Sequence, residues 1–502
     1  MKKNIKDKIF ILVFMLILIV PFATMNFKHN QTSEIDNKVL TEFPELSLSS
    51  ETIETIEDYV DDRVGFREQA IAIYTNSVDK LFGVMIHPLF MYGKEGHIFY
   101  KDPDYISAYQ RLNTDEEYLD DLTDFLVKTN EYLSKKNIKF LYYLCPDKKT
   151  IYPEYFPDSI HVKEDNTPVI SYMKDKLSKT DIEYVIPNEE LLEAKKSQVV
   201  YNKMYDATHW NEFGSFLAHK LLDKHIQNWF DDVKPLTEDD FSLEYVKMTN
   251  LDTSDFPIDD DVPVYTLNVD TSEDATEYLE PALDINTTTF YAHFMNPNVE
   301  NGKKLLIFTD SYFATYHKYY NNRFSEVYYV HRQNYDFVQY IVDLVFPDAV
   351  IFETAERSIS SEMLALCDFK DCYYETSYDG SYERKEPEFD LSYTVTDVKG
   401  VRVDGNKIFI NPEGGESIVS IGGIMNDYNA CKDLNIYMII DGNYVETDYC
   451  MLHRLAVEEG LKRFSMNIQR RFVAPGEIEL IAVDEATKTE YHIDTFEVEY
   501  GN

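Results

Sequence analysis

The pattern of apolar and polar positions divides the chain into three regions, and the middle one alternates short apolar runs with amphipathic stretches. Residues 113–133 place apolar side chains on one helical stripe, and Thr114 with Glu117 predicts a capping box at its start. Apolar runs too short for a typical helix predict strands buried on both faces. These runs occupy residues 138–145, 181–187, 303–310, 325–332 and 348–353. Further helices are predicted at 169–179, 212–230 and 336–346.

Strands that alternate with helices predict a parallel sheet with helices on both faces, and this α/β domain is expected to span residues 85–385. Residues 231–300 interrupt the alternation with an acidic, Thr-rich stretch, which we expect to be an excursion near the functional site. The acidic run 259–261 lacks a Gly-containing loop with spaced ligands. A solvated acidic turn is therefore favoured over a calcium site.

From about residue 390 the pattern changes to short alternating runs separated by turn signals, with no long helix. Asp404-Gly405 and Asp441-Gly442 predict hairpin turns. Residues 390–502 are therefore expected to form a β-sandwich domain. Such a domain can bind carbohydrate or pack against a catalytic domain, and the sequence does not distinguish these roles.

The N-terminus carries four lysines in its first eight residues, followed by seventeen uncharged residues from Ile9 to Met25. This pattern predicts a cytoplasmic tail and transmembrane anchor over residues 1–27, and a cleaved signal peptide is the alternative. The lysines should remain in the cytoplasm. We therefore expect a single-pass protein of the cell membrane whose bulk is extracytoplasmic, with a stalk and leading helices over residues 28–84.

The net charge and the cysteine content limit the classes of partner and of metal site that the chain can have. The 502-residue chain has 90 acidic and 48 basic residues, a net charge of −42, and no basic stripe in the expected ectodomain. Nucleic acid is thus an improbable partner. Five cysteines form neither a dense framework nor a zinc-binding pattern. Cys431 could pair with Cys450, or Cys367 with Cys372, and both possibilities remain open.

The candidate chemistry lies at Ser311, which follows the apolar run 303–310 directly. A Ser at the carboxyl end of a parallel strand stands where α/β sheets place reactive groups, and the helix expected after it could supply amides for an oxyanion. Taken alone, the pair Asp310-Ser311 favours a helix cap over a nucleophile.

A serine nucleophile needs a base and a carboxylate that orients the base. Asp206 and His209 lie three residues apart at a loop-to-helix junction and could supply both. Alone, Asp206 reads as a cap and His209 as a satisfied histidine. His317 and His331 are alternative bases because they lie near Ser311 in the sequence.

The segments TDSYF and DATHWNEFG resemble the Ser block and the Asp-x-x-His block of SGNH hydrolases. Here His209 precedes Ser311, and that order resembles the permuted branch that contains the alginate O-acetyltransferase proteins and the DHHW family. Further similar segments are FPELS, DDRVGFRE, MYGKEGHIFY, PDKKTIYPEYFP and FPDAVIFETAER. Each motif alone is weak, but their order and spacing over residues 40–360 are specific. The β-sandwich is similar to the carbohydrate-binding module found in part of that family.

The resemblance implies that Ser311 is the nucleophile, His209 the general base and then acid, and Asp206 its orienting carboxylate. Two positions depart from the family pattern. Ala207 occupies the usual position of the aspartate, and Thr309 replaces the usual glycine before Asp-Ser, which would put a side chain beside the oxyanion. The Ser311 amide is one expected oxyanion donor, and the second cannot be identified from sequence.

Two further polar residues, Lys148 and Arg357, match positions that the family keeps polar, although structural salt bridges explain them equally well. Two aromatic residues, Tyr152 and Trp210, are expected to be packing residues.

The resemblance thus implies a membrane-anchored, extracytoplasmic acyltransferase that O-acetylates a cell-surface or secreted polysaccharide. It implies no metal or soluble cofactor, and it suggests a polytopic membrane acyltransferase as the source of acyl groups. The alternatives are a non-catalytic polysaccharide-binding or scaffold protein with the same fold, a carbohydrate acetyl esterase, and a D-alanine transfer protein of teichoic acid.

Overall fold

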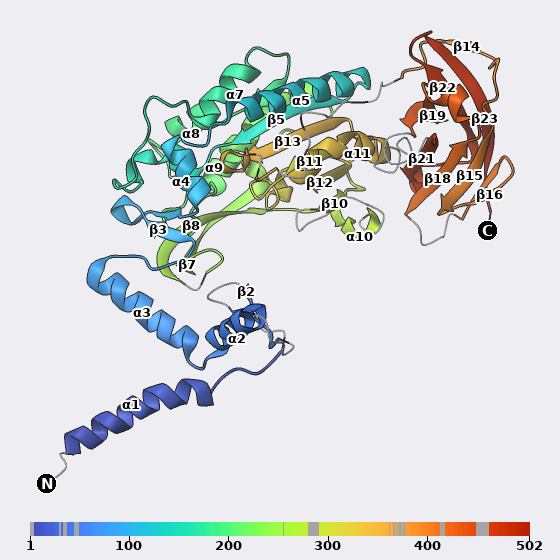
Figure 1. Ribbon diagram of the computed structural model, residues 1–502. Helices are drawn as coiled ribbons and strands as arrows, with labels where there is room; N and C mark the ends of the chain where they lie inside the picture. The colour runs from blue at the N-terminus through green and yellow to red at the C-terminus, as the bar shows by residue number, and fades with distance from the viewer. Residues whose placement is uncertain are drawn as a thin grey trace.

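The protein is described from a computed structural model, which has a mixed α/β architecture with several sheets (Figure 1). The described residues are 5–29, 32–33, 38–44, 50–254, 256–279, 291–360, 362–364, 367, 369, 374, 378–411, 417–447 and 461–501. Cys372 and Cys450 lie outside these ranges, so both possible disulfides stay open.

The largest element is a seven-stranded sheet in which five strands run parallel. Its order is β6 (Glu183–Val185), β5 (Lys139–Cys145), β13 (Ala349–Ala355), β11 (Lys304–Thr309), β12 (Glu326–His331), β10 (Ala292–Met295) and β9 (Glu273–Asp274). The first five strands coincide with the five apolar runs and confirm them. β10 and β9 add an antiparallel edge.

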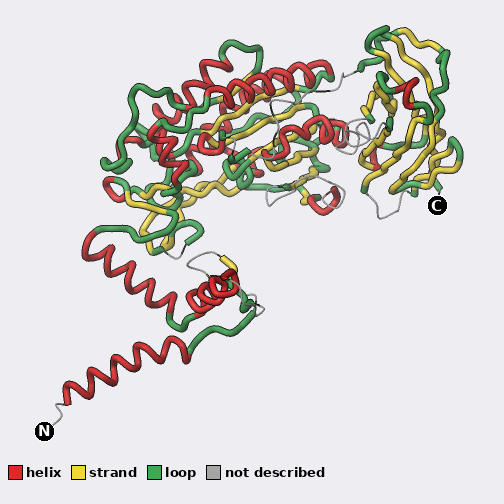
Figure 2. The backbone as a smooth tube through the Cα atoms, viewed as in Figure 1, coloured by secondary structure: helices red, strands yellow, loops and turns green. Residues whose placement is uncertain are grey.

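The strands β5, β11, β12 and β13 are buried on both faces, as their uninterrupted apolar runs predict. For the edge strand β6 that expectation is wrong, because Glu183 is exposed and Tyr184 is half-buried. In β5, Phe140, Tyr142 and Leu144 face one core, whereas Leu141, Tyr143 and Cys145 face the other. The first core is completed by α5 (Glu116–Lys135), α7 (Val169–Leu177) and α11 (Val338–Val345). The second is completed by α8 (Asn188–Ala194) and α9 (Glu212–Trp229). Figure 2 shows these helices flanking the strands.

The helix α5 confirms the amphipathic pattern, but the predicted capping box is wrong. Asp115 is the N-cap and accepts a hydrogen bond from the Tyr118 amide at 3.2 Å. Thr114 instead donates to the Thr167 carbonyl at 2.7 Å. An Asp is as good a cap as Thr, and here the tertiary partner of Thr114 decides between them.

The acidic excursion forms a long hairpin of β7 (Phe241–Asn250) and β8 (Pro257–Leu267). Asp259, Asp260 and Asp261 lie within β8, so the expectation of an acidic turn is wrong. The strand pattern alternates, because Lys247 pairs with Asp259 and Asp261 on one face while Asp260 faces the protein. The hairpin therefore points the half-buried carboxylate of Asp260 toward residues 204–205.

The C-terminal part consists of two sheets around one core. The larger sheet contains β16 (Arg402–Asp404), β17 (Lys407–Ile410), β23 (Thr489–Tyr500), β22 (Gly476–Asp484), β19 (Asn435–Ile440) and β20 (Asn443–Glu446), with β14 (Glu383–Lys385) beside β23. The smaller contains β15 (Tyr393–Lys399), β18 (Ile418–Met425) and β21 (Arg463–Gln469), and α12 (Tyr428–Cys431) follows β18. Both hairpin turns are confirmed: Gly405 has φ 59°, and Asp441 and Gly442 have φ 48° and 78°.

This C-terminal part packs against the amino ends of the parallel strands. Arg471 Nη2 donates to Tyr328 Oη at 2.7 Å, and Gln469 Nε2 donates to the same oxygen at 3.1 Å. Lys304 Nζ, at the start of β11, lies 3.8 Å from the centroid of the Phe472 ring. The carboxyl ends of the strands, where Ser311 lies, face away from this contact (Figure 1).

The N-terminal elements precede the α/β domain along the chain. They are α1 (Ile5–Ala23), β1 (Thr32–Ser33), β2 (Lys38–Val39), α2 (Ser50–Arg63), α3 (Arg67–Phe82), β3 (Phe90–Tyr92), β4 (Ile98–Tyr100) and α4 (Pro103–Gln110). Among the described residues, no helix has both the length and the apolar character needed to cross a membrane. The described residues thus do not support the expected transmembrane helix, and α1 carries Lys6, Asp7 and Lys8 in its first turn.

Candidate active site

The structure brings Ser311, His209 and Asp206 together at the carboxyl edge of the parallel sheet. His209 Nε2 lies 2.8 Å from Ser311 Oγ, and His209 Nδ1 lies 2.8 Å from Asp206 Oδ2. With the Nδ1 proton shared with the carboxylate, Nε2 presents a lone pair to the serine hydroxyl. Ser311 and His209 are 102 residues apart, so the fold alone creates this arrangement.

Asp206 is not a cap of the following helix, because Asn211 caps α9 by accepting from the Phe213 and Gly214 amides. Asp206 Oδ1 instead accepts from the Thr208 amide at 2.8 Å and the His209 amide at 2.9 Å. Burial alone would raise its pKa, but His209 and these amides outweigh burial and lower the pKa below the ordinary value. The spacing of three residues thus lets one carboxylate hold both the loop and the imidazole.

The loop that carries Asp206 is fixed from both sides. Lys148 Nζ donates to the carbonyls of Ile98, Lys203 and Asp206 at 2.8, 3.1 and 3.2 Å. On the other side, Asp260 Oδ2 of the hairpin accepts from the Met204 and Tyr205 amides at 2.8 and 3.0 Å. Lys148 follows β5 in the short helix α6 (Lys148–Ile151), so the sheet and the hairpin both position Asp206.

Ser311 lies in a turn, and the helix expected directly after it is absent from the described residues 311–316. A helix N-terminus therefore does not supply oxyanion amides here. Asp310, which is buried, holds the turn: Oδ1 accepts from the Tyr312 amide at 3.0 Å, and Oδ2 accepts from the Ala355 amide at 2.9 Å. Because Ala355 ends β13, the neighbouring strand fixes the nucleophile's backbone.

Thr309 does not place its hydroxyl at the reacting atoms. Its Oγ1 donates to Glu353 Oε2 at 2.8 Å, and the Asp310 amide donates to the same oxygen at 2.9 Å. Glu353 is fully buried, and burial together with the nearby Asp310 raises its pKa well above the ordinary value. This glutamate was missed by sequence reasoning, although an acid at the end of the apolar run 348–353 was a visible signal.

Arg357 is the functional residue whose place the sequence did not settle. Its Nη2 lies 3.0 Å from His209 Nε2 and 3.3 Å from Ser311 Oγ, and its Nη1 is paired with Asp147. The fully buried Asp147 also accepts from Lys149 Nζ at 2.9 Å and from Tyr312 Oη at 3.1 Å. The guanidinium is therefore anchored at one end and presents an N–H group to the reacting atoms at the other.

In the part of the chain that the structure describes, the two alternative histidine bases do not contact Ser311, and the two aromatic residues singled out in the sequence lie in the protein core. His317 packs against Phe294 and Tyr329, and burial lowers its pKa to about 4. His331 lies beside Arg332, and its pKa is likewise lowered to about 4, mainly by burial. Tyr152 and Trp210 are buried, which confirms them as packing residues.

A cavity of about 450 Å³ opens over the candidate triad. Its lining comes from residues 89–105, from the catalytic loop 206–209, from the hairpin turn at Asp252 and Thr253, and from Arg357, Glu362 and Met363. Thr253 has φ 60°, a left-handed conformation that is rare for a β-branched residue. The expectation that the excursion lies near the site is thus confirmed, since its turn forms one wall of the cavity.

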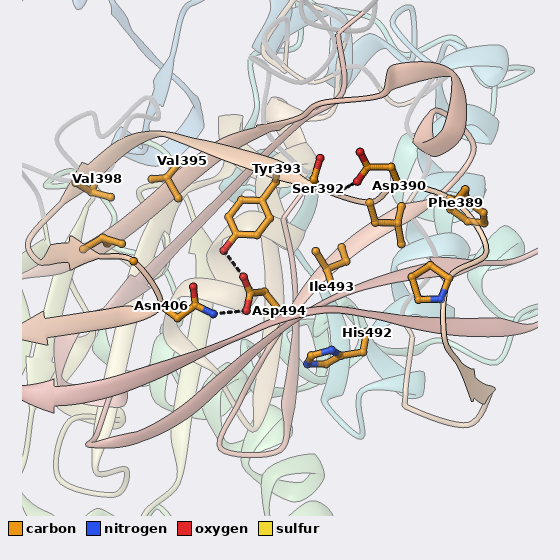
Figure 3. Close-up of a pocket in the computed structure, with 14 residues that line it drawn as sticks. Phe389, Asp390, Ser392, Tyr393, Val395, Val398, Asn406, His492, Ile493 and Asp494 are labelled. Carbon is orange, nitrogen blue, oxygen red and sulfur yellow. Dashed lines mark hydrogen bonds between the residues drawn. The ribbon is translucent and has the colours of Figure 1, made fainter.

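A second and larger hollow, of about 890 Å³, lies in the C-terminal part (Figure 3). Its labelled polar side chains are tied to one another, because Asp494 accepts from Tyr393 Oη at 2.9 Å and from Asn406 Nδ2 at 2.5 Å. His492 Nε2 lies 2.8 Å from Thr495 Oγ1. This hollow is the larger of the two, but among the described residues no carboxylate contacts His492. The complete set of hydroxyl, imidazole and carboxylate therefore lies at the smaller cavity, which Asp206 and His209 line.

No protein-family model and no curated protein matches the chain. Solved structures that resemble it include PatB1 of Bacillus cereus with a sulfonyl adduct, at 18% identity and TM-score 0.39, over 55% of this chain and 96% of that one. A DHHW family protein from Eubacterium siraeum has 17% identity and TM-score 0.37, over 58% and 100%. The O-acetyltransferase domain of AlgJ from Pseudomonas putida has 14% identity and TM-score 0.38, over 57% and 99%.

Structures of the DHHW and alginate O-acetyltransferase types are thus among those that resemble this chain, as the sequence resemblance predicts. All of these TM-scores lie below 0.5.

We expect Asp260→Ala to slow acylation of Ser311 about tenfold, because two amides of the catalytic loop lose a charged acceptor. The rate is measured with a chromogenic ester. Asp259→Ala is the matched control, because Asp259 is the adjacent residue of the strand and its carboxylate pairs with Lys247 at the surface. The acylation rate of this variant should stay within about twofold of the parent rate. Equal rates in the two variants would contradict the proposed fixing of the loop.

Burial lowers the pKa of Lys148 to about 7, although Asp206 and Asp260 oppose the shift. The folded state therefore binds fewer protons than the unfolded state between about pH 7 and the ordinary lysine pKa. Over that window the Lys148 contribution should raise stability as pH rises, by on the order of 1 kcal/mol per pH unit at most. Comparing Tm against pH for the parent and Lys148→Met tests this, and parallel curves would contradict it.

Proposed function

We propose that this protein is an SGNH-type acyltransferase that esterifies a polysaccharide hydroxyl through an acyl-Ser311 intermediate. The observation that carries the proposal is the continuous chain from Asp206 through His209 to Ser311, with two contacts of 2.8 Å. Nucleophile, base and orienting carboxylate have the mutual geometry that acyl transfer requires. A scaffold protein would not need all three side chains aligned in this way.

In the first half-reaction, Ser311 Oγ attacks the carbonyl carbon of the donor ester while its proton passes to His209 Nε2. The tetrahedral intermediate collapses, the bond to the donor oxygen breaks, and that oxygen takes the proton from Nε2. In the second, the sugar hydroxyl gives its proton to Nε2 and attacks the acyl-serine. Ser311 Oγ then leaves and recovers the proton, so atoms and charges balance over one turnover.

Arg357 and the Ser311 amide are the proposed donors to the oxyanion. Arg357 Nη2 already lies 3.3 Å from Ser311 Oγ, close to where the carbonyl oxygen of a bound ester would develop charge. Burial would lower the pKa of Arg357, but Asp147 and its other neighbours outweigh this and raise it well above the ordinary value. The guanidinium is therefore charged throughout the reaction.

The acetyl group, the polysaccharide acceptor and the polytopic membrane acyltransferase that supplies acyl groups are proposed from the sequence resemblance. We propose an extracytoplasmic location at the cell membrane for the same reason, supported by the exposed apolar side chains of α1 and the lysines before them. External protease on intact cells tests this location. A fully protected chain, in cells whose interior stays intact, would contradict it.

Incubation of the protein with a chromogenic acetyl ester should produce one covalent acetyl group on Ser311, found by peptide mass spectrometry. Ser311→Ala should show no adduct. His209→Ala should lower its formation by at least about a thousandfold, and Asp206→Ala by about a hundredfold, because the base loses its orientation. Absence of the adduct in the parent protein would contradict the proposal that the protein is an enzyme. An unchanged rate of adduct formation in Asp206→Ala would show that Asp206 takes no part in the mechanism.

The same preparation separates transfer from hydrolysis. With polysaccharide present, a transferase should place ester-linked acetate on sugar hydroxyls, whereas an esterase should release acetate to water in equal amounts with and without polysaccharide. The second result would assign the same triad to de-esterification.

Arg357→Lys should lower the kcat of acylation about a hundredfold with a smaller change in KM, because the charge is kept but the two-point anchorage on Asp147 and the oxyanion is lost. Stopped-flow measurement of the acyl-enzyme separates the two constants. An effect confined to KM would mean that Arg357 binds substrate without stabilising the oxyanion.

A further inference from the structure

The cavity that His209 and Arg357 line beside Ser311 has an acidic wall. Besides Asp206, four carboxylates are among its described lining residues, and they come from three separate segments of the chain: Asp102, Asp104, Asp252 and Glu362. The cationic lining residue is Arg357, whose charge is already paired with the buried Asp147. The space that a substrate enters is therefore surrounded by uncompensated negative charge.

The internal contacts of these carboxylates do not neutralise them. Asp102 accepts from the Asp104 and Tyr105 amides as the N-cap of α4, and Asp252 Oδ1 accepts from Tyr205 Oη at 3.4 Å. Within the described part of the chain, none of the four forms an ion pair. No three His, Cys, Asp or Glu side chains there converge closely enough to hold a metal ion. The four charges are spread around the opening of the cavity, so together they produce a negative electrostatic potential inside it.

The deepest of the four is Asp252, at the hairpin turn beside the catalytic loop. Its backbone amide donates to the Tyr205 carbonyl at 2.9 Å, so the carboxylate is held next to Asp206. Burial and the nearby Asp206 raise the pKa of Asp252 above its ordinary value. The position is therefore one where additional positive charge would be stabilised.

We infer that the acceptor is a glycan that carries protonated amino groups close to the hydroxyl that is acylated, and that polyuronates are poor acceptors. This inference rests on the proposed acyl transfer and adds the charge class of its substrate. A sugar ammonium inside the cavity would lie among Asp102, Asp104, Asp252 and Glu362, whereas a uronate carboxylate would be repelled by all of them. The aromatic lining residues Phe90 and Tyr100 suit a sugar ring that bears a cation.

The test compares oligosaccharides of equal length at pH 6 and low ionic strength: glucosamine oligomers with free amines, their N-acetylated counterparts, and oligouronates. Ser311 is first acetylated with the neutral chromogenic ester, and base-labile acetate on each sugar is then measured. We expect kcat/KM in the order cationic, neutral, anionic, with about tenfold between the first two. Equal values, or faster transfer to the uronate, would overturn the inference.

Two variants identify the source of this preference. Asp104→Asn with Glu362→Gln removes two exposed rim charges and should reduce the preference for the cationic acceptor about fourfold, or about twofold for each charge. Asp239→Asn with Glu238→Gln removes the same number of exposed charges at the base of the hairpin, outside the cavity. This matched control should leave the preference unchanged. An equal reduction in both variants would assign the preference to net charge and overturn the role of the cavity.

Binding of the same oligosaccharides to Ser311→Ala keeps this inference separate from the proposed reaction. The cationic oligomer could bind about tenfold more tightly than the neutral one while the parent forms no acetyl-serine. That result would support a cationic ligand and contradict the proposed acyl transfer. If acetyl-serine forms but binding ignores charge, acyl transfer stands and the charge class is wrong.

Discussion

The buried charge of Asp147 is the interaction on which the site depends. This carboxylate follows β5, is fully buried, and is shared by Lys149, Tyr312 and Arg357. Breaking one member of such a network leaves an uncompensated buried charge, which typically costs about 3–5 kcal/mol. The three partners come from the ends of three neighbouring strands, so one carboxylate fixes the relative positions of the strand ends that carry Ser311 and Arg357. The loop 206–209 joins the same network through Tyr312, whose hydroxyl oxygen also lies 2.9 Å from the Thr208 carbonyl oxygen.

The features that the sequence could predict are those set by local pattern. The apolar runs predicted β5, β11, β12 and β13 because these strands are buried on both faces and therefore contain few polar residues. The fifth run predicted β6, which is a half-exposed edge strand. The hairpin glycines and the grouping of Asp206, His209 and Ser311 also followed from short motifs. The features that it could not predict depend on tertiary partners. Asp115 replaced Thr114 as a cap because Thr114 found a distant carbonyl. The orientation of Arg357 toward Ser311 required Asp147 to anchor it from another strand.

The hairpin of β7 and β8 links the geometry of the site to the proposed preference for a cationic acceptor. One of its strands supplies Asp260, which holds the catalytic loop, and its turn supplies Asp252 and Thr253 to the cavity. A change in the turn would therefore alter both the shape of the acceptor site and the support of Asp206. By contrast, the two-sheet C-terminal part lies at the amino ends of the strands, a full strand length from Ser311. Any sugar it holds reaches the cavity only if the polymer spans that length.

The strand order of the parallel sheet also determines when this site can exist. β13 lies between β5 and β11, yet it is the last of the three to be synthesised. Until residue 349 has emerged, β5 and β11 have no common neighbour, so the two halves of the sheet cannot join. The Ala355 amide that holds Asp310, and Arg357 two residues later, arrive only after that closure. A nascent or truncated chain would thus contain Asp206, His209 and Ser311 without being able to align them, and catalytic competence would be acquired in a single late step of folding.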